Sequence, residues 1–136
     1  MTHAIQQLEG EPIVVVTFTG SFGAQELGEF MPQAVEMQRE SGDPLYWIID
    51  LRATWSDFAQ IIDMIAHQSR GTPGTATNAP GRVFLVGSTH VTHAYTDGMR
   101  QPQFGGLDIP IFADLEAALT AVRRIARGDS PQDEAP

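Results

Sequence analysis

Two histidines three residues apart, His90 and His93, are the residues in this chain best suited to chemistry, and Asp97 follows four positions later. On a helix, this spacing places all three side chains along one face. Imidazoles and carboxylates bind divalent metals, but a metal usually needs a further ligand and an outer layer of hydrogen bonds that orients each imidazole. The remaining histidines, His3 and His67, are expected elsewhere in the fold. A metal or small-ligand site at His90, His93 and Asp97, enzymatic or not, is therefore kept as an alternative hypothesis.

Nucleophilic catalysis has less support than metal binding. Ser88 lies close to both histidines in the sequence, but the Gly-x-Ser-x-Gly turn that presents a nucleophilic serine is absent. The chain has no cysteine, which excludes disulfides, thiolate catalysis and thiolate metal ligands. Because no convergent catalytic set is visible, we predict a protein that is not an enzyme and has no cofactor.

The charge of the chain disfavours two classes of partner, nucleic acids and anionic membranes. The formal net charge is −9, and all eight basic residues are arginines. A nucleic-acid-binding protein needs a clustered basic surface, and an anionic membrane attracts basic segments, so both partners are disfavoured. The longest apolar runs are far too short to span a membrane, and the N-terminal residues lack the pattern of a signal peptide. We expect a cytoplasmic protein without stable membrane insertion.

Short apolar runs predict the strands of one sheet. Residues 12–20 are rich in β-branched side chains and end in glycine, and residues 4–10 can pair with them as a hairpin through Gly10. Residues 45–51 and 82–87 are almost continuously apolar, which is typical of parallel strands covered on both faces. Residues 109–115 form a shorter, final strand.

Three segments have the apolar periodicity of helices. Residues 24–42 contain Pro32, which predicts a kink or a late start, and Gly42 is a natural end. Residues 54–71 begin with a capping box of Thr54 and Asp57, or with Ser56 as the cap. Residues 114–128 begin at Asp114. The apolar stripes of these three helices are, in order, Leu27, Phe30, Met31, Ala34 and Val35; Phe58, Ile61, Ile62 and Ile65; and Leu115, Ala118, Leu119, Val122 and Ile125.

Together these elements predict a single α/β domain over residues 1–127, followed by a disordered acidic tail over residues 128–136. The expected order is ββαβαβαβα, with a short helix between the strands at 82–87 and 109–115. Crossovers of this length give right-handed parallel connections, so we expect a mixed, mostly parallel sheet of about five strands.

The chain resembles the STAS / SpoIIAA-like group, small α/β modules related to bacterial anti-sigma-factor antagonists. The resemblance covers roughly residues 3–126 and rests on "TFTGSFGAQEL", "LYWIIDLRATWSDF", "RVFLVGS" and "IPIFADLEAALTAV". It implies a non-catalytic binding or regulatory module that acts on a protein partner or a small apolar ligand. Antagonists of the group carry an Asp-Ser pair, with a phosphorylated serine, after the central strand. Here Asp50 is followed by the shorter "RATWSD", and Ser56 lacks the usual neighbours, so phosphorylation there is not expected.

The binding site is expected at the carboxyl ends of the parallel strands, where ligands of α/β sheets usually bind. Residues 20–25, 51–57 and 87–93 should meet at this edge. Its polar residues either surround a polar ligand or, as such serines more often do, cap helices. Its aromatic residues either line an apolar pocket or partner interface, or pack on the following helix. The predicted binding residues are Phe22, Arg52, Trp55, Ser56, Ser88, His90 and Phe104. A third hypothesis makes Trp55 and Phe104 the interface of a homo-oligomer.

Overall fold

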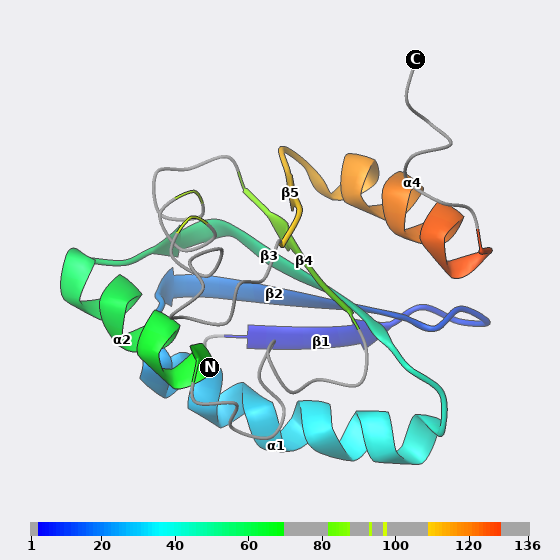
Figure 1. Cartoon of the computed structure of the whole chain (residues 1–136), viewed down its shortest axis with the longest axis horizontal. Coiled ribbons are helices and arrows are strands. Elements are labelled where there is room, and N and C mark those ends of the chain that lie inside the picture. The colour runs from blue at the N-terminus through cyan, green and yellow to red at the C-terminus, as the bar shows by residue number, and fades with distance from the viewer. Residues whose placement is uncertain (1–2, 70–81, 88–92, 94–96, 98–108, 129–136) are drawn as a thin grey trace.

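The fold is a five-stranded sheet with helices on both of its faces, seen in a computed structural model that describes residues 3–69, 82–87, 93, 97 and 109–128. Strand β1 is antiparallel to β2, and the other neighbouring strands are parallel, in the order β1-β2-β3-β4-β5 (Figure 1). This confirms the predicted α/β class and the mostly parallel sheet. The described elements are β1 (His3–Gln7), β2 (Ile13–Ser21), α1 (Ala24–Ser41), β3 (Tyr46–Trp55), α2 (Phe58–Ser69), β4 (Arg82–Val86), β5 (Ile111–Phe112) and α4 (Leu115–Ala126).

The first two strands form the predicted hairpin. The backbone N–H of Leu8 donates to the carbonyl of Ile13 at 2.9 Å, which closes the turn. Gly10 in this turn has a φ of 74°, a conformation that side chains with a Cβ rarely adopt. The glycine noted in the sequence therefore has a defined structural role.

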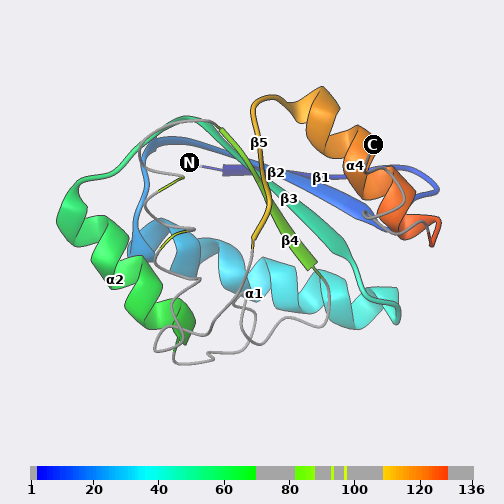
Figure 2. The same cartoon turned by 45° about the horizontal axis from the view of Figure 1, so that its top comes forward.

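Each face of the sheet carries its own hydrophobic cluster. Along β2, Val14, Val16 and Phe18 point to the face that α1 and α2 cover. Ile13 and Val15 point to the opposite face, which α4 covers, and Figure 2 shows α4 on the other side of the sheet from α1 and α2. This alternation follows from the two-residue period of a strand. It explains why the sequence of β2 is apolar at nearly every position.

Helix α1 begins earlier than one of the two predicted alternatives and ends where it was predicted to end. It begins at Ala24 and runs through Pro32, so a start delayed to the proline is wrong. The start is fixed by the carboxylate of Glu26, which accepts a hydrogen bond from the backbone N–H of Gly23 at 2.7 Å. Phe30 before Pro32 and Ala34 after it are both buried, so the helix packs on the sheet on both sides of the proline. Gly42 ends the helix with a φ of 76°, as predicted.

The region between β3 and α2 differs most from expectation. Strand β3 continues to Trp55 because, after a register shift that gives β3 one extra residue between Asp50 and Ala53, its last residues pair with Thr19, Gly20 and Ser21. Helix α2 begins at Phe58, and its cap is Asp57 rather than Thr54 or Ser56. The Asp57 carboxylate accepts from the N–H of Gln60 at 2.8 Å, and the Gln60 side chain accepts from the N–H of Asp57 at 2.9 Å.

The C-terminal part follows the prediction closely, apart from the length of β5. Asp114 caps α4 by accepting from the N–H of Ala117 at 2.8 Å, as expected. Strand β5 contains only Ile111 and Phe112, because Pro110 has no N–H to donate and the helix cap follows almost at once. Within the described residues, no helix is long and apolar enough to cross a membrane.

Candidate functional site

The carboxyl ends of β2 and β3 are joined into one structural unit. The N–H of Phe22 donates to the carbonyl of Trp55 at 2.9 Å, and the hydroxyl of Ser56 donates to the carbonyl of Phe22. The side-chain amide of Gln60 donates to the hydroxyl of Ser21 at 3.0 Å. The first two of the three predicted segments, residues 20–25 and 51–57, therefore meet at this edge of the sheet.

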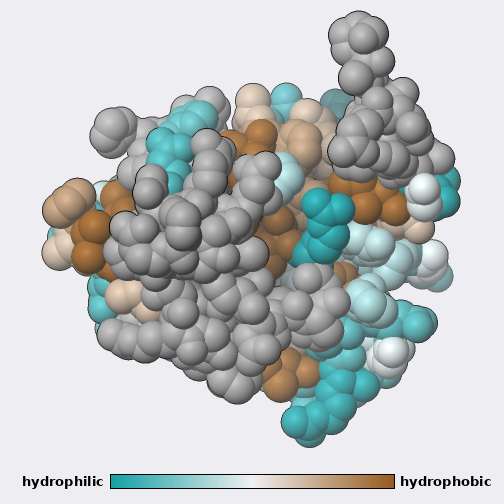
Figure 3. Space-filling model, in the orientation of Figure 1, coloured by the Kyte–Doolittle hydropathy of each residue, from teal (hydrophilic) through white to brown (hydrophobic). Residues whose placement is uncertain are grey.

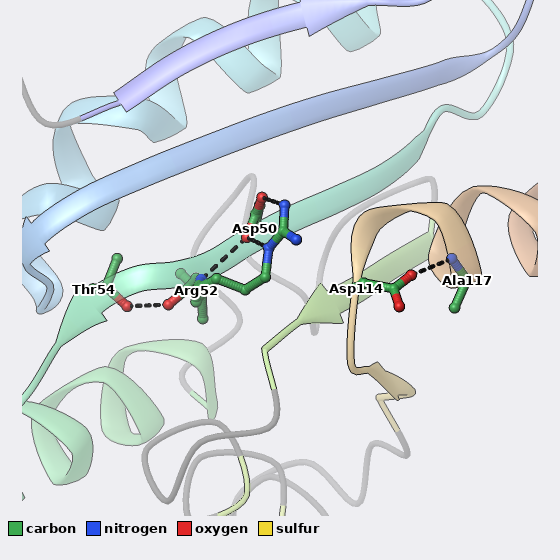
Figure 4. A network of polar contacts seen from close by, with 6 residues as sticks. Asp50, Arg52, Thr54, Asp114 and Ala117 are labelled. Carbon is green, nitrogen blue, oxygen red and sulfur yellow. Dashed lines mark hydrogen bonds and ion pairs between the residues drawn. The ribbon is translucent and has the colours of Figure 1, made fainter.

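Ser56 has a bonding role different from the predicted cap. Its hydroxyl hydrogen is donated to the Phe22 carbonyl across the two strands, and the start of α2 is capped by Asp57. Thr54, the other proposed cap, donates its hydroxyl to the carbonyl of Leu51 at 2.7 Å (Figure 4). Both hydroxyls thus stabilise the end of β3, because residues of a strand end lack the full set of backbone partners.

Asp50 and Arg52 form a close ion pair on the face of the sheet that α4 covers. Asp50 lies inside β3, opposite Thr17 and Val86, because the strand continues beyond the predicted residues 45–51. Residues two apart on a strand share a face, so Arg52 reaches back to the carboxylate. The guanidinium Nη2 lies 2.8 Å from Oδ2, and Nε lies 3.0 Å from Oδ1 (Figure 4). The backbone N–H of Arg52 also donates to Oδ1, at 3.1 Å.

This geometry satisfies a carboxylate that is only 5% exposed and holds an arginine side chain that is half exposed. The hydrogen bond and the charge of Asp50 raise the pKa of Arg52 above its usual value, with a smaller contribution from the charge of Asp114. An approaching anion therefore meets Arg52 as one half of a neutral pair, with a second carboxylate nearby. The planar guanidinium of Arg52 is thus held by a bidentate pair with Asp50 and carries little net positive charge toward solvent.

The two aromatic residues expected at this edge, Phe22 and Trp55, have different environments. Phe22 belongs to the core, with its ring centroid 4.7 Å from that of Phe18. Trp55, the last residue of β3, is 60% exposed. The sequence left open whether Trp55 lines a contact surface or packs on the following helix, and its side chain is largely exposed.

Two further exposed apolar residues were missed by the sequence analysis. Phe58 is 76% exposed and Ile62 is 48% exposed, although both were assigned to the buried stripe of their helix. Their spacing of four residues places them on one side of α2. Trp55, the last residue of β3, precedes Phe58 by three residues in the chain. We call these three residues, Trp55, Phe58 and Ile62, the α2 patch. Figure 3 shows hydrophobic surface gathered at the end of the molecule that α2 forms.

Nothing in the spacing alone distinguishes Ile62 from the buried Ile61. Both residues suit an amphipathic helix, and both lie within the apolar arc of α2. No sequence signal would have identified the exposed part of this helix.

The histidine segment is only partly described. His93 and Asp97 both have helical backbone and exposed side chains, which agrees with the short helix expected there. Ser88, His90 and Phe104 lie outside the described residues. Within the described part of the chain, no group of three or more histidine, cysteine or acidic residues could hold a metal. The alternative site at His90, His93 and Asp97 stays a prediction.

Comparisons with known proteins place the fold. No family model and no curated protein sequence matches this chain. An uncharacterised protein of the DUF3478 family with a SpoIIAA-like fold, from Shewanella loihica PV-4, is 13% identical with a TM-score of 0.56, and the match covers 88% of this chain and 90% of the other. An anti-sigma factor antagonist from Mycobacterium paratuberculosis is 21% identical with a TM-score of 0.52, covering 90% and 93% of the two chains. The resemblance to the STAS / SpoIIAA-like group is thus confirmed at the level of fold.

Proposed function

We propose that this chain is a non-enzymatic regulatory module that binds a protein partner through the α2 patch. The observation that carries the proposal is the exposure of Trp55, Phe58 and Ile62, three large apolar side chains within eight consecutive residues of the chain. Grouped apolar residues at a protein surface mark interaction sites far more often than isolated ones do. Tryptophan in particular is enriched among the residues that dominate binding energies.

The local structure favours a preformed site. The backbone bond from Phe22 to Trp55, the reciprocal bonds of Asp57 and Gln60, and the bond from Gln60 to Ser21 fix the start of α2 on the sheet. A rigid surface loses little conformational entropy when it binds, so more of the contact energy appears as affinity.

Polar groups at the same edge supply orientation in this proposal. Arg52 presents its guanidinium beside the buried Asp50, and Ser56 fixes the strand end that carries Trp55. Ser88, His90 and Phe104, which follow β4 in the sequence, are kept in this proposal as predicted binding residues. An anti-sigma factor antagonist among the structures of the same fold supports a regulatory, protein-binding role.

The proposal is tested by comparing two substitutions at the same exposed position, Phe58. Phe58→Leu keeps an apolar side chain, whereas Phe58→Asp introduces a charge, and neither change disturbs the core because Phe58 is exposed. A partner captured from cells of the source organism by the natural chain and by Phe58→Leu should be lost with Phe58→Asp and with Ile62→Asp. The purified partner is then titrated directly, with the fluorescence of Trp55 as the signal.

Unchanged affinity in folded Phe58→Asp and Ile62→Asp chains would contradict the proposal. Native mass spectrometry of the chain purified from its own cells addresses the finer alternative of an apolar small ligand. A co-purifying lipid-like molecule that is absent from Phe58→Asp would assign the patch to that ligand instead.

A further inference from the structure

The edge strand β1 has backbone groups that lie ready to pair with another strand. The N–H of Leu8 donates to Ile13, its partner across the hairpin, so this is a hydrogen-bonded pair. Hydrogen-bonded and non-hydrogen-bonded pairs alternate along an antiparallel ladder. His3, Ile5 and Gln7 therefore turn their N–H and C=O groups away from β2, toward the open edge of the sheet (Figure 1).

Among the described strands, β1 pairs with β2 alone. Natural sheets protect an open edge with charged side chains, proline or a bulge, because unpaired backbone groups attract a further strand. Strand β1, with the sequence HAIQQ, contains no proline and no acidic or arginine residue, and its register with β2 is regular. This lack of protection stands out in a chain that has 17 acidic residues and a net charge of −9.

We propose that β1 pairs antiparallel with β1 of a second copy of this chain, around a two-fold axis through Ile5. In this register Ile5 faces Ile5 of the second copy, and His3 faces Gln7 of the second copy. Both are hydrogen-bonded pairs, so every outward N–H and C=O of the three edge-facing residues finds a partner. The two sheets join into one continuous sheet with five strands from each copy.

The side chains agree with a second copy as the occupant. Ile5 packs against the cluster under α1 and is only partly buried there, so the Ile5 side chains of the two copies would cover one another. On the other face, Ala4 lies opposite Gln6 of the second copy. No pair in the register brings two like charges together, and a two-fold interface requires such self-complementarity.

The charge of the rest of the chain predicts how this association depends on salt. The Nε2–H of His3 donates a 2.9 Å hydrogen bond to Oε1 of Gln33, which places α1 beside β1. Exposed acidic residues of α1, such as Glu29 and Glu40, therefore lie on the same side of the joined sheets in both copies. Because salt screens repulsion between like charges, dimerisation should strengthen as the ionic strength rises.

The first test compares Gln7→Pro with Gln7→Ala in sedimentation velocity over a dilution series of the whole chain. Both changes remove an exposed side chain, but only proline removes an outward N–H group. The natural chain and Gln7→Ala should dimerise alike. Gln7→Pro should raise the dissociation constant about tenfold or more, because one hydrogen bond is lost from each copy. A chain that is monomeric at every concentration, or a folded Gln7→Pro that dimerises unchanged, would overturn the proposal.

The second test keeps the proposal falsifiable if the proline variant fails to fold. The natural chain has no cysteine, so an introduced cysteine is the sole thiol. In Ile5→Cys, the two introduced cysteines face each other at the two-fold axis. Their Cα atoms would lie about 5.5 Å apart, which is within reach of a disulfide. In Ala4→Cys, the Cα atoms of the two introduced cysteines would lie farther apart than the roughly 7 Å limit for a disulfide. Oxidation should cross-link Ile5→Cys and not Ala4→Cys; equal cross-linking of both, or of neither, refutes the register. The α2 patch takes no part in these tests, so their outcome is independent of the proposed function.

Discussion

Helices α2 and α4 each contain twelve residues, and the sequence gives both an apolar stripe at helical spacing. In α4 this stripe is covered: Ala118 and Val122 are fully buried, and Leu115, Leu119 and Ile125 pack around them. In α2, Ile61 is buried, whereas Phe58 and Ile62 are exposed to solvent.

The difference comes from where each helix lies. Helix α4 contacts β3, β4 and β5 and crosses one face of the sheet, so its whole stripe meets other apolar side chains. Helix α2 contacts α1 and lies at one end of the molecule (Figures 1 and 2). The same amphipathic pattern therefore builds part of the core on one helix and leaves large apolar side chains exposed on another.

The largest expected contrast comes from placing a carboxylate on each helix. Val122→Asp puts an unpaired charge in a fully buried site and should lower the free energy of unfolding by more than about 4 kcal/mol. Ile62→Asp places the same group in water and should change it by about 0.5 kcal/mol or less. Urea unfolding followed by circular dichroism measures both. Equal losses in the two variants would mean that α2 is as buried as α4.

A smaller contrast lies within α2 itself. Ile61→Ala leaves a cavity in the core and should cost about 2–4 kcal/mol, within the range for large-to-small core changes. Ile62→Ala removes a side chain that is already half exposed and should cost about 1 kcal/mol or less. The same urea unfolding experiment applies, with each variant serving as the control of the other. A larger loss at Ile62 would reverse our assignment of the exposed side.

The caps of the two helices should respond alike. Asp57→Ala and Asp114→Ala each remove the acceptor for a backbone N–H in the first helical turn and should each cost about 1 kcal/mol. Asp57→Asn and Asp114→Asn should lose less, because asparagine also caps helices well. Thermal unfolding of the four variants measures these effects. If Asp57→Ala left the stability unchanged, Asp57 would not be the effective cap of α2.

The smallest effect on stability is expected at Trp55, one of the two tryptophans of the chain. Trp55→Phe should change the free energy of unfolding by about 0.5 kcal/mol or less, because Trp55 is exposed. The remaining fluorescence comes from Trp47, which lies in the core against Phe30 and should be shielded from acrylamide quenching. In Trp47→Phe, the emission of Trp55 should be quenched readily. Similar quenching in both variants would contradict an exposed α2 patch.

Much of the fold was predictable because local sequence and tertiary structure agree. The start of α4 at Asp114, the end of α1 at Gly42 and the β-branched run of β2 depend on nearby residues. The candidate site was less predictable. The sequence left open whether Trp55 is exposed or packs on the next helix, and Phe22 proved to be part of the core. The role of Ser56 depends on a carbonyl 34 residues away in the chain.

By itself, the sequence determined the α/β class, the order of the elements and the positions at which most of them begin and end. These features follow from short-range periodicity, capping residues and glycines, all of which act over a few neighbouring residues. Only the tertiary structure decided that β3 continues to Trp55, that Asp50 is buried against Arg52, and that half of the α2 stripe faces solvent. Burial depends on which distant segments pack against a helix, and the period of a single helix carries no information about them.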